Sequence, residues 1–204
     1  MHRMNLAVRA YHLIITAYGF WLPNDPRGSW SDFVRDWELF RFGGPATKTD
    51  ARRSLANDPH DHSKRKQVKE HLARKPVSFN GEQARAIARG FASYSYRSGL
   101  VIHACAIMPE HIHLVVARHT TSIEQVANLL KGAATSQLRA ENLHPFQDEP
   151  YKNGTFPTPW ARGCWKCFLS LDEQIVKAID YTNANPEKEG KARQSWNFVQ
   201  PFAA

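Results

Sequence analysis

The sequence predicts an α+β fold, in which an antiparallel sheet carries helices on one face and is followed by a C-terminal helix. Three observations indicate this class. Short β-branched runs alternate with segments of helical periodicity, two of those runs are only two residues apart, and a helix-initiating pattern follows the last run. The 204 residues, 42% of them hydrophobic, are enough for one sizeable core. We therefore expect one domain over residues 1–204, with a polar, charged insertion at about residues 22–76.

The first strand is expected at residues 11–18 (YHLIITAY), an apolar, partly β-branched run that ends at a turn-prone segment. The polar stretch that continues to about Pro76 predicts an insertion that is partly helical at best. Asn80 can then cap a first long helix, which Gly99 ends. Its apolar positions recur at helical spacing: Ala84, Ile87, Ala88 and Phe91.

Two strands are expected next, at residues 100–108 (LVIHACAIM) and 111–118 (HIHLVVAR). Only Pro109-Glu110 separates them, which favours an antiparallel hairpin. Residues 121–124 (TSIE) form a capping-box pattern at the start of a second long helix. Its apolar stripe consists of Val126, Leu129, Leu130, Ala133 and Leu138.

A last strand is expected at residues 163–169, after a loop rich in Pro and Gly. Residues 170–173 (SLDE) suggest a further capping box, and the helix behind it should end at Asn185 because Pro186 restricts the residue before it. The order is strand, helix, hairpin of two strands, helix, strand and terminal helix. This order fits a split β-α-β arrangement of the ferredoxin-like kind.

The composition indicates which kinds of partner the chain can bind. Its net charge of +8 attracts polyanions, of which nucleic acid is the commonest soluble kind. No apolar run is long enough to span a bilayer and the opening residues lack a secretory pattern, so we expect a cytoplasmic, nucleoid-associated protein with no membrane partner. An odd number of cysteines argues against a disulfide framework, and the C-x-x-C pair Cys164 and Cys167 lacks a second pair for zinc.

His111 and His113 stand at i and i+2 in a predicted strand, so both imidazoles project from one face. An isolated H-x-H is more often a pair of satisfied histidines than a metal site. Here the alternating apolar residues dedicate the opposite face to the core, which leaves the histidine face for a ligand. A second H-x-H at residues 60–62 is surrounded by proline and charge and is interpreted as a loop.

Tyr181 and Asn185 are four residues apart on the terminal helix, so the phenol and the amide lie one above the other. They belong to a stripe with Gln174 and Lys177, about a quarter-turn from an apolar stripe at Leu171, Ile175, Ile179 and Thr182. Tyr181 therefore flanks the buried face. From this helix alone, ordinary amphipathic packing is the simpler interpretation.

Three blocks together resemble the HUH single-tyrosine transposases, particularly the REP-associated tyrosine transposases and their insertion-sequence relatives. The blocks are residues 107–116 (IMPEHIHLVV), 159–163 (PWARG) and 180–186 (DYTNANP). The resemblance covers nearly the whole chain apart from the insertion. Two departures are the Glu187 to Gly190 run, where the family often has Val-Lys, and Thr182, where it usually has isoleucine. Neither alters a proposed catalytic atom, although both could affect DNA preference.

The resemblance implies a function and a role for each matching residue. Tyr181 would be the nucleophile, and His111, His113 and Asn185 would be the protein ligands of Mg²⁺ or Mn²⁺. The enzyme would cleave and rejoin single-stranded, hairpin-bearing DNA in transposition and recombination, through a 5′-phosphotyrosine intermediate and a free 3′-hydroxyl. Relatives act as monomers or as homodimers, so both states remain open.

DNA contacts are expected from the basic surface, although most such side chains are individually just solvated charges. The residues proposed for DNA binding are Arg118, Lys131, Trp160, Arg162 and Lys177, with a further basic cluster at residues 64–75. Trp160, like the nearby Trp165, could stack on unpaired bases, and a buried core position is an equally good interpretation of either.

Other functional classes are less well supported. A histidine-triad hydrolase needs a third histidine where Val115 stands, and the phosphodiesterases with paired H-x-T/S motifs need two copies where only His119-Thr120-Thr121 occurs. A catalytically inactive DNA- or RNA-binding protein of the same fold remains the alternative.

Overall fold

The computed structural model describes residues 7–29, 31–49, 55 and 58–203. The chain forms two compact units, one made of Met1–Ala17 and Ser78–Ala204 and the other of Tyr18–Val77. The predicted insertion at about residues 22–76 lies within the second unit, whereas the H-x-H motif and the terminal helix belong to the first. No helix in the described part of the chain is long and apolar enough to cross a membrane.

The first unit is built on a four-stranded sheet in the order β2-β3-β1-β4. Every neighbouring pair is antiparallel. The strands are β1 (Ala10–Thr16), β2 (Ile102–Ile107), β3 (His111–Ala117) and β4 (Trp165–Leu169). β2 and β3 form the expected hairpin, closed by a hydrogen bond from Met108 N–H to His111 O of 2.9 Å. The predicted α+β class and its ferredoxin-like strand order are confirmed.

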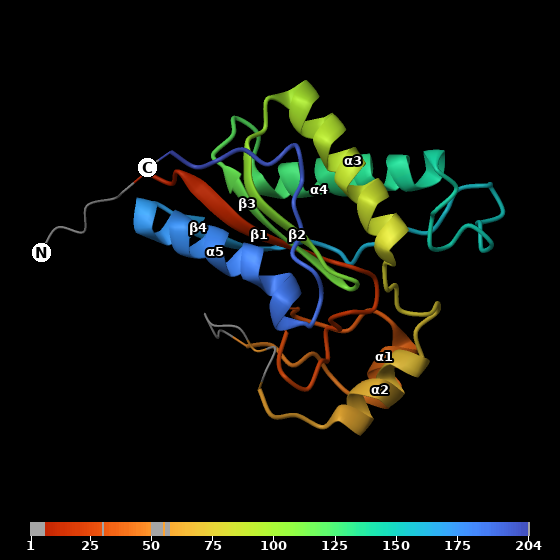
Figure 1. Ribbon diagram of the computed structural model, residues 1–204. Helices are drawn as coiled ribbons and strands as arrows, with labels where there is room; N and C mark the ends of the chain where they lie inside the picture. Colours follow the sequence, from red (N-terminus) through yellow and green to blue (C-terminus); the bar gives the residue numbers. More distant parts are fainter. Residues whose placement is uncertain (1–6, 30, 50–54, 56–57, 204) are drawn as a thin grey trace, which may run out of the picture. The chain divides into compact units, whose positions relative to one another are not determined.

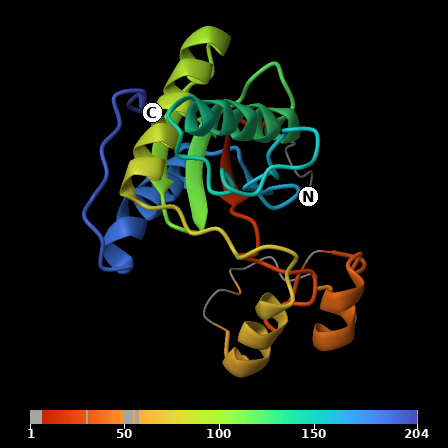
Figure 2. The same cartoon turned by 90° about the vertical axis from the view of Figure 1, so that its right-hand side faces the viewer.

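One face of the sheet is covered by α3 (Gly81–Ser98) and α4 (Ile123–Ala140), and the other by α5 (Asp172–Lys188) (Figures 1 and 2). Asn80 and Gln83 close the N-terminus of α3 as a reciprocal capping box, and Gly99 ends it at a φ of 71°. A Cβ atom at Gly90 would lie 2.7 Å from Ala133 O, so glycine at this position permits the close approach of α3 to α4.

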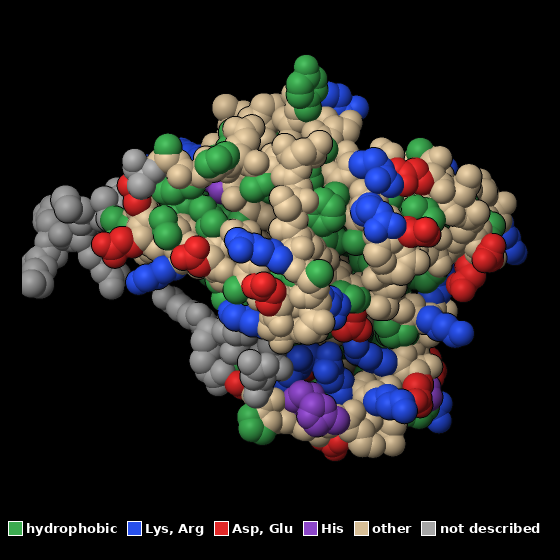
Figure 3. Space-filling view, in the orientation of Figure 1, with side chains coloured by type: hydrophobic (Ala, Val, Ile, Leu, Met, Phe, Trp, Pro, Cys, Tyr) green, Lys and Arg blue, Asp and Glu red, His purple; other side chains and the backbone are tan. Residues whose placement is uncertain are grey.

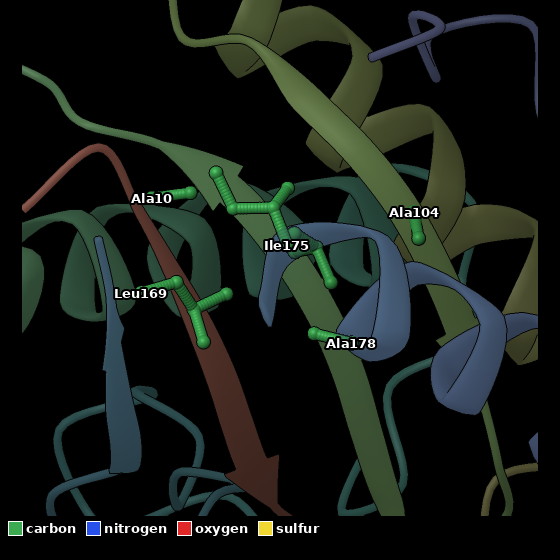
Figure 4. Packing of buried hydrophobic residues seen from close by; sticks show 6 residues of the cluster. Ala10, Ala104, Leu169, Ile175 and Ala178 are labelled. Atoms are coloured by element: carbon green, nitrogen blue, oxygen red, sulfur yellow. The ribbon is translucent and has the colours of Figure 1, made fainter. Parts of the chain in front are cut away.

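The α5 face has its own apolar cluster (Figure 4). All four strands and α5 contribute to it. Its members are Ala10, Ala104, Val115, Leu169, Ile175 and Ala178. Because side chains alternate along a strand, Val115 on this face places His113 and His111 there too. The same alternation assigns Ile112, Leu114 and Val116, all fully buried, to the α3/α4 face.

Both ends of α5 differ from the prediction. The N-cap is Leu171, without a side-chain cap, and the Gln174 side chain, not Glu173, accepts hydrogen bonds from the N–H groups of Ser170 (2.9 Å) and Leu171 (3.2 Å). The helix also continues through Pro186 to Lys188. Pro186 is buried, and its carbonyl accepts from Lys191 N–H at 2.8 Å, so the last turn is stabilised although proline supplies no N–H of its own.

The chain after α5 runs along the outer edge of β2, and no sequence pattern predicted this. The Gln194 side chain pairs with both backbone groups of Ile107, at 2.7 and 2.8 Å. Trp196 Nε1 donates to Cys105 O at 3.1 Å, and Val199 forms a parallel bridge with Ile102. An open strand edge is a site of aggregation, and these contacts cover it.

The second unit contains α1 (Trp37–Gly43) and α2 (His62–Glu70), so the insertion is partly helical as expected. Its buried carboxylate, Asp25, forms ion pairs with Arg27 (2.8 Å) and Arg65 (3.3 Å). Of the H-x-H at residues 60–62, His60 lies in a loop as expected, Asp61 is the N-cap of α2, and His62 begins the helix.

Candidate functional site

β3 presents His111 and His113 side by side on the α5 face of the sheet. Their ring centroids are 4.9 Å apart and the ring planes are nearly perpendicular, at 84°. The sequence predicted that this face would be left open, and that expectation is wrong in one respect. α5 covers it, so His113 is only 4% exposed, while His111 remains partly accessible.

Tyr181 approaches these histidines from α5. Its ring centroid is 5.5 Å from that of His113, and the side chain is 41% exposed. The buried residues of α5 include Ile175, Ala178 and Thr182. Leu171, expected in the buried stripe, is exposed because it precedes the helix. Tyr181 flanks the buried stripe, so its ring lies beside the histidines and is partly exposed.

Asn185, one turn beyond Tyr181 on α5, is buried. Its Nδ2 atom donates to Tyr181 O at 3.0 Å. The amide nitrogen is therefore engaged by the helix itself, which leaves Oδ1 as the amide atom suited to act as an acceptor or a metal ligand.

The structure adds His12, which the sequence analysis did not single out. His12 Nε2 lies 3.0 Å from His113 Nδ1, and the two rings stack at 5.2 Å and 25°. The His12 ring is also 5.7 Å from the Tyr181 ring. A histidine in the first strand was the only available signal, and it became informative only when the sheet order placed β1 beside β3.

Two charged residues at the end of α5 lie near Tyr181 and His111. Lys188 Nζ lies 4.6 Å from the centroid of the Tyr181 ring. Glu189 Oε1 lies 3.8 Å from His111 Nε2 and also pairs with Lys191 at 3.6 Å. Both residues are in the segment that departs from the family pattern, and both reach the candidate site.

Burial favours the uncharged form of all three imidazoles by lowering their pKa values. It lowers the pKa of His113 to about 2, with smaller contributions from His111, His12 and Lys188. Burial likewise lowers the pKa of His12 to about 4. The pKa of His111 is also lowered by burial, although Glu189 and Glu110 oppose the shift. A neutral imidazole has a nitrogen lone pair to offer a cation.

The residues present suit a divalent cation at His111 and His113. Two imidazoles bound to one cation at about 2.1 Å would have ring centroids about 5 Å apart, close to the observed 4.9 Å. Within the described ranges, no three His, Cys, Asp or Glu side chains are grouped as a metal site. The amide oxygen of Asn185, which the sequence analysis expected as the third ligand, is not of these residue types.

Three of the residues proposed for DNA contact, Arg118, Arg162 and Lys177, are exposed. Over α5, however, basic and acidic side chains lie next to one another instead of forming one continuous basic patch (Figure 3). Cys164 and Cys167 are free thiols, as expected of a chain without a disulfide framework.

Lys131 and Trp160 occupy positions that do not fit DNA contact. Lys131 is 8% exposed, and its ammonium donates to the carbonyls of Ala161 and Gly163, so it holds the loop before β4. Trp160 is 3% exposed and donates from Nε1 to Thr135 Oγ1 at 2.9 Å. Burial corrects the expectation for Lys131, and for Trp160 it favours the alternative interpretation, a core position. Lys131 of α4 and Trp160 of the loop both tie that loop, which carries Arg162, to α4.

Comparison with known proteins supplies an independent finding. The family model for IS200-like transposases matches residues 65–167, which include the H-x-H motif and end before α5. No curated protein matches the chain.

Two solved structures are similar at low identity. A REP-associated tyrosine transposase bound to a REP hairpin is 12% identical, with a TM-score of 0.47 over 97% of this chain and 80% of that one. A Deinococcus radiodurans R1 protein assigned as a transposase is 16% identical, with a TM-score of 0.36 over 95% of this chain and 98% of that one.

Proposed function

The chain belongs to the family of IS200-like transposases, and from this premise we propose that it cleaves and rejoins single-stranded DNA through a covalent bond to Tyr181. The membership agrees with the family that the three sequence blocks indicated, and DNA is the partner of such an enzyme. The substrate that we propose is single-stranded DNA bearing a hairpin. The observation that carries the proposal is the position of the Tyr181 ring, 5.5 Å from that of His113 in the same chain.

In the proposed reaction, Tyr181 Oη attacks the phosphorus of a DNA phosphodiester and loses its proton to solvent. The bond from phosphorus to the 3′ oxygen breaks, and that oxygen takes up a proton to become a free 3′-hydroxyl. The product is a 5′-phosphotyrosine, whose bond a 3′-hydroxyl can attack in the reverse sense. The number of phosphoester bonds is conserved, so rejoining needs no external energy source.

His111, His113 and Asn185 are the proposed ligands of the cation. The histidines come from one strand and the amide from the helix that carries the nucleophile, so the packing of α5 on the sheet sets the distance between ligand and nucleophile. A divalent cation, Mg²⁺ or Mn²⁺, would supply Lewis-acid polarisation of the attacked phosphate. Lys188 adds a fixed positive charge beside the phenol.

The proposal also covers the organisation of the protein. We propose one catalytic domain over residues 1–204 with an insertion at about residues 22–76, which lies within the compact unit Tyr18–Val77. The proximity of Tyr181 to His113 within one chain supports cleavage by a complete site in each monomer, without a tyrosine from a second copy. Arg118, Arg162 and Lys177 remain the proposed contacts to DNA phosphates.

The proposal is tested by trapping the covalent intermediate. Wild-type protein, incubated with labelled single-stranded hairpins and Mn²⁺, should give a protein–DNA adduct that survives a denaturing gel, and EDTA should prevent it. Tyr181→Phe should reduce the adduct to background while leaving hairpin binding intact. Tyr96→Phe, which alters a 92% exposed tyrosine on α3, is the matched control and should form the adduct normally.

Two results would contradict the proposal. One is an adduct of wild-type yield in Tyr181→Phe. The other is wild-type protein that binds the hairpins equally well with and without a divalent cation and forms no adduct, which would favour the inactive DNA-binding protein.

A further inference from the structure

A third histidine, His12, lies beside the proposed site. It lies on β1 and is buried, and its Nε2 atom is 3.0 Å from His113 Nδ1. The proposed reaction gives it no role. A buried imidazole at hydrogen-bond distance from a proposed metal ligand constrains the chemistry of that ligand, because only one of the two nitrogens can donate.

The sheet register explains why the two rings meet. β1 and β3 pair antiparallel with His12 opposite Val115 and Ile14 opposite His113. His12 and His113 are therefore diagonal neighbours on the same face, within reach of each other. Trp165 of β4 packs edge-on against His12, with ring centroids 6.1 Å apart. The position of His12 is thus set by the strands on both sides of β1.

The hydrogen bond admits two proton arrangements with opposite consequences. If His12 donates, Nδ1 of neutral His113 is the acceptor and Nε2 carries the proton, so His113 has no free lone pair for a cation. If His12 accepts, the proton of His113 is on Nδ1 and the lone pair of Nε2 is available. A metal-ligating histidine commonly donates its other ring N–H to a neighbouring acceptor, which fixes its tautomer and orientation.

We infer that His12 is a positioning residue, whose Nε2 accepts a hydrogen bond from Nδ1–H of His113 and so holds the lone pair of His113 Nε2 available for the cation. The inference rests on the proposed function in one respect, namely that His113 is a ligand. His12 itself touches neither the cation nor the DNA. Its contribution is the tautomer and the orientation of the His113 ring.

The experiment reads the tautomer and the metal affinity separately, in protein without DNA. Two-dimensional ¹⁵N–¹H correlation spectra of the metal-free protein distinguish an Nδ1–H from an Nε2–H imidazole. Wild-type His113 should be in the Nδ1–H form. In His12→Phe, which keeps an aromatic ring and removes the acceptor, that form should lose its dominance and Mn²⁺ should bind roughly 10- to 100-fold more weakly.

Two further variants separate positioning from packing. His12→Gln supplies an amide oxygen that can accept the same hydrogen bond, so it should recover part of the Mn²⁺ affinity and of the Nδ1–H form. His103→Phe is the matched control, because His103 is a histidine of the same sheet with a single ring-nitrogen bond, to Gln200 O at 3.0 Å. It should leave both readouts at wild-type values.

An Nε2–H tautomer of His113 in the wild-type spectrum would overturn the inference, whether or not the variants fold. Wild-type tautomer and Mn²⁺ affinity in His12→Phe would do the same. Failure of the proposed function is a different result, since it would leave no Tyr181-dependent adduct while the tautomer of His113 still depended on His12.

Discussion

The two faces of the sheet carry different kinds of side chain, although the same strands form both. On the α3/α4 face, β3 contributes Ile112, Leu114 and Val116, which are aliphatic and fully buried. On the α5 face, the same strand contributes His111 and His113 beside Val115. The first face is sealed by apolar packing, whereas the second keeps polar groups under a helix that carries Tyr181. The aliphatic side chains of β3 thus lie on one face, and the residues proposed for the chemistry lie on the other.

The largest effect is expected from removing a buried side chain on the α3/α4 face. Leu114→Ala deletes a side chain with no exposed surface, so the free energy of unfolding should fall by about 2–5 kcal/mol. Chemical denaturation measures this loss. The matched control is Leu129→Ala on α4, where the side chain is 46% exposed and the change should stay within about 0.5 kcal/mol. Equal losses at the two positions would mean that the α3/α4 face is not the stabilising one.

The buried histidines on the α5 face should make the stability of the protein depend on pH. Burial lowers the pKa of His12 to about 4 and that of His113 to about 2, both below the unfolded value of about 6.5. Below that value the unfolded chain binds more protons than the folded one. Stability should therefore be complete above about pH 6.5 and fall on acidification, by up to about 1.4 kcal/mol per pH unit for each histidine.

Denaturation of metal-free protein between pH 7 and pH 5 measures this slope. His12→Phe removes one of the titrating groups and should flatten the curve. Leu114→Ala should lower the whole curve and keep its slope. If the slope is the same in His12→Phe as in wild type, burial of His12 does not couple its protonation to folding.

The smallest effects come from two glycines that distinguish tight from open packing within the α3/α4 layer. A Cβ at Gly90 would meet the backbone of α4 at 2.7 Å, so Gly90→Ala should destabilise the protein by about 1–3 kcal/mol. A Cβ at Gly132 meets nothing within 4 Å, so Gly132→Ala should stabilise it by about 0.5–1 kcal/mol. Thermal unfolding compares them, and a shift of the same sign in both variants would contradict the assignment of close contact to Gly90 alone.

Much of the fold was predictable because its signals are local. The hairpin follows from two apolar runs joined by Pro109-Glu110, and the ends of α3 follow from Asn80 and Gly99. The predicted end of α5 at Asn185 failed because the bias against a helical residue before proline is only a preference. Burial of Pro186 and the bond to its carbonyl from Lys191 outweigh it.

The burial of residues proposed for DNA binding, in contrast, could not be predicted from local signals. Arg162 and Lys177 are exposed as a basic surface requires, but Lys131 and Trp160 are buried. The residues next to Lys131 and Trp160 in the sequence do not indicate whether other segments of the chain will cover these side chains. The carbonyls of Ala161 and Gly163, which lie far from Lys131 in the sequence, decide the position of its ammonium.

The sequence by itself determined the fold class, the family and the two residues of the H-x-H motif, because strand alternation alone places His111 and His113 on one face. Only the tertiary structure decided that α5 covers that face and that His12 lies against His113. Both facts depend on which strands are neighbours and which side a helix packs on. Those choices are made by apolar burial between segments distant in the chain, such as Ile175 of α5 against Val115 of β3, and no local pattern encodes them.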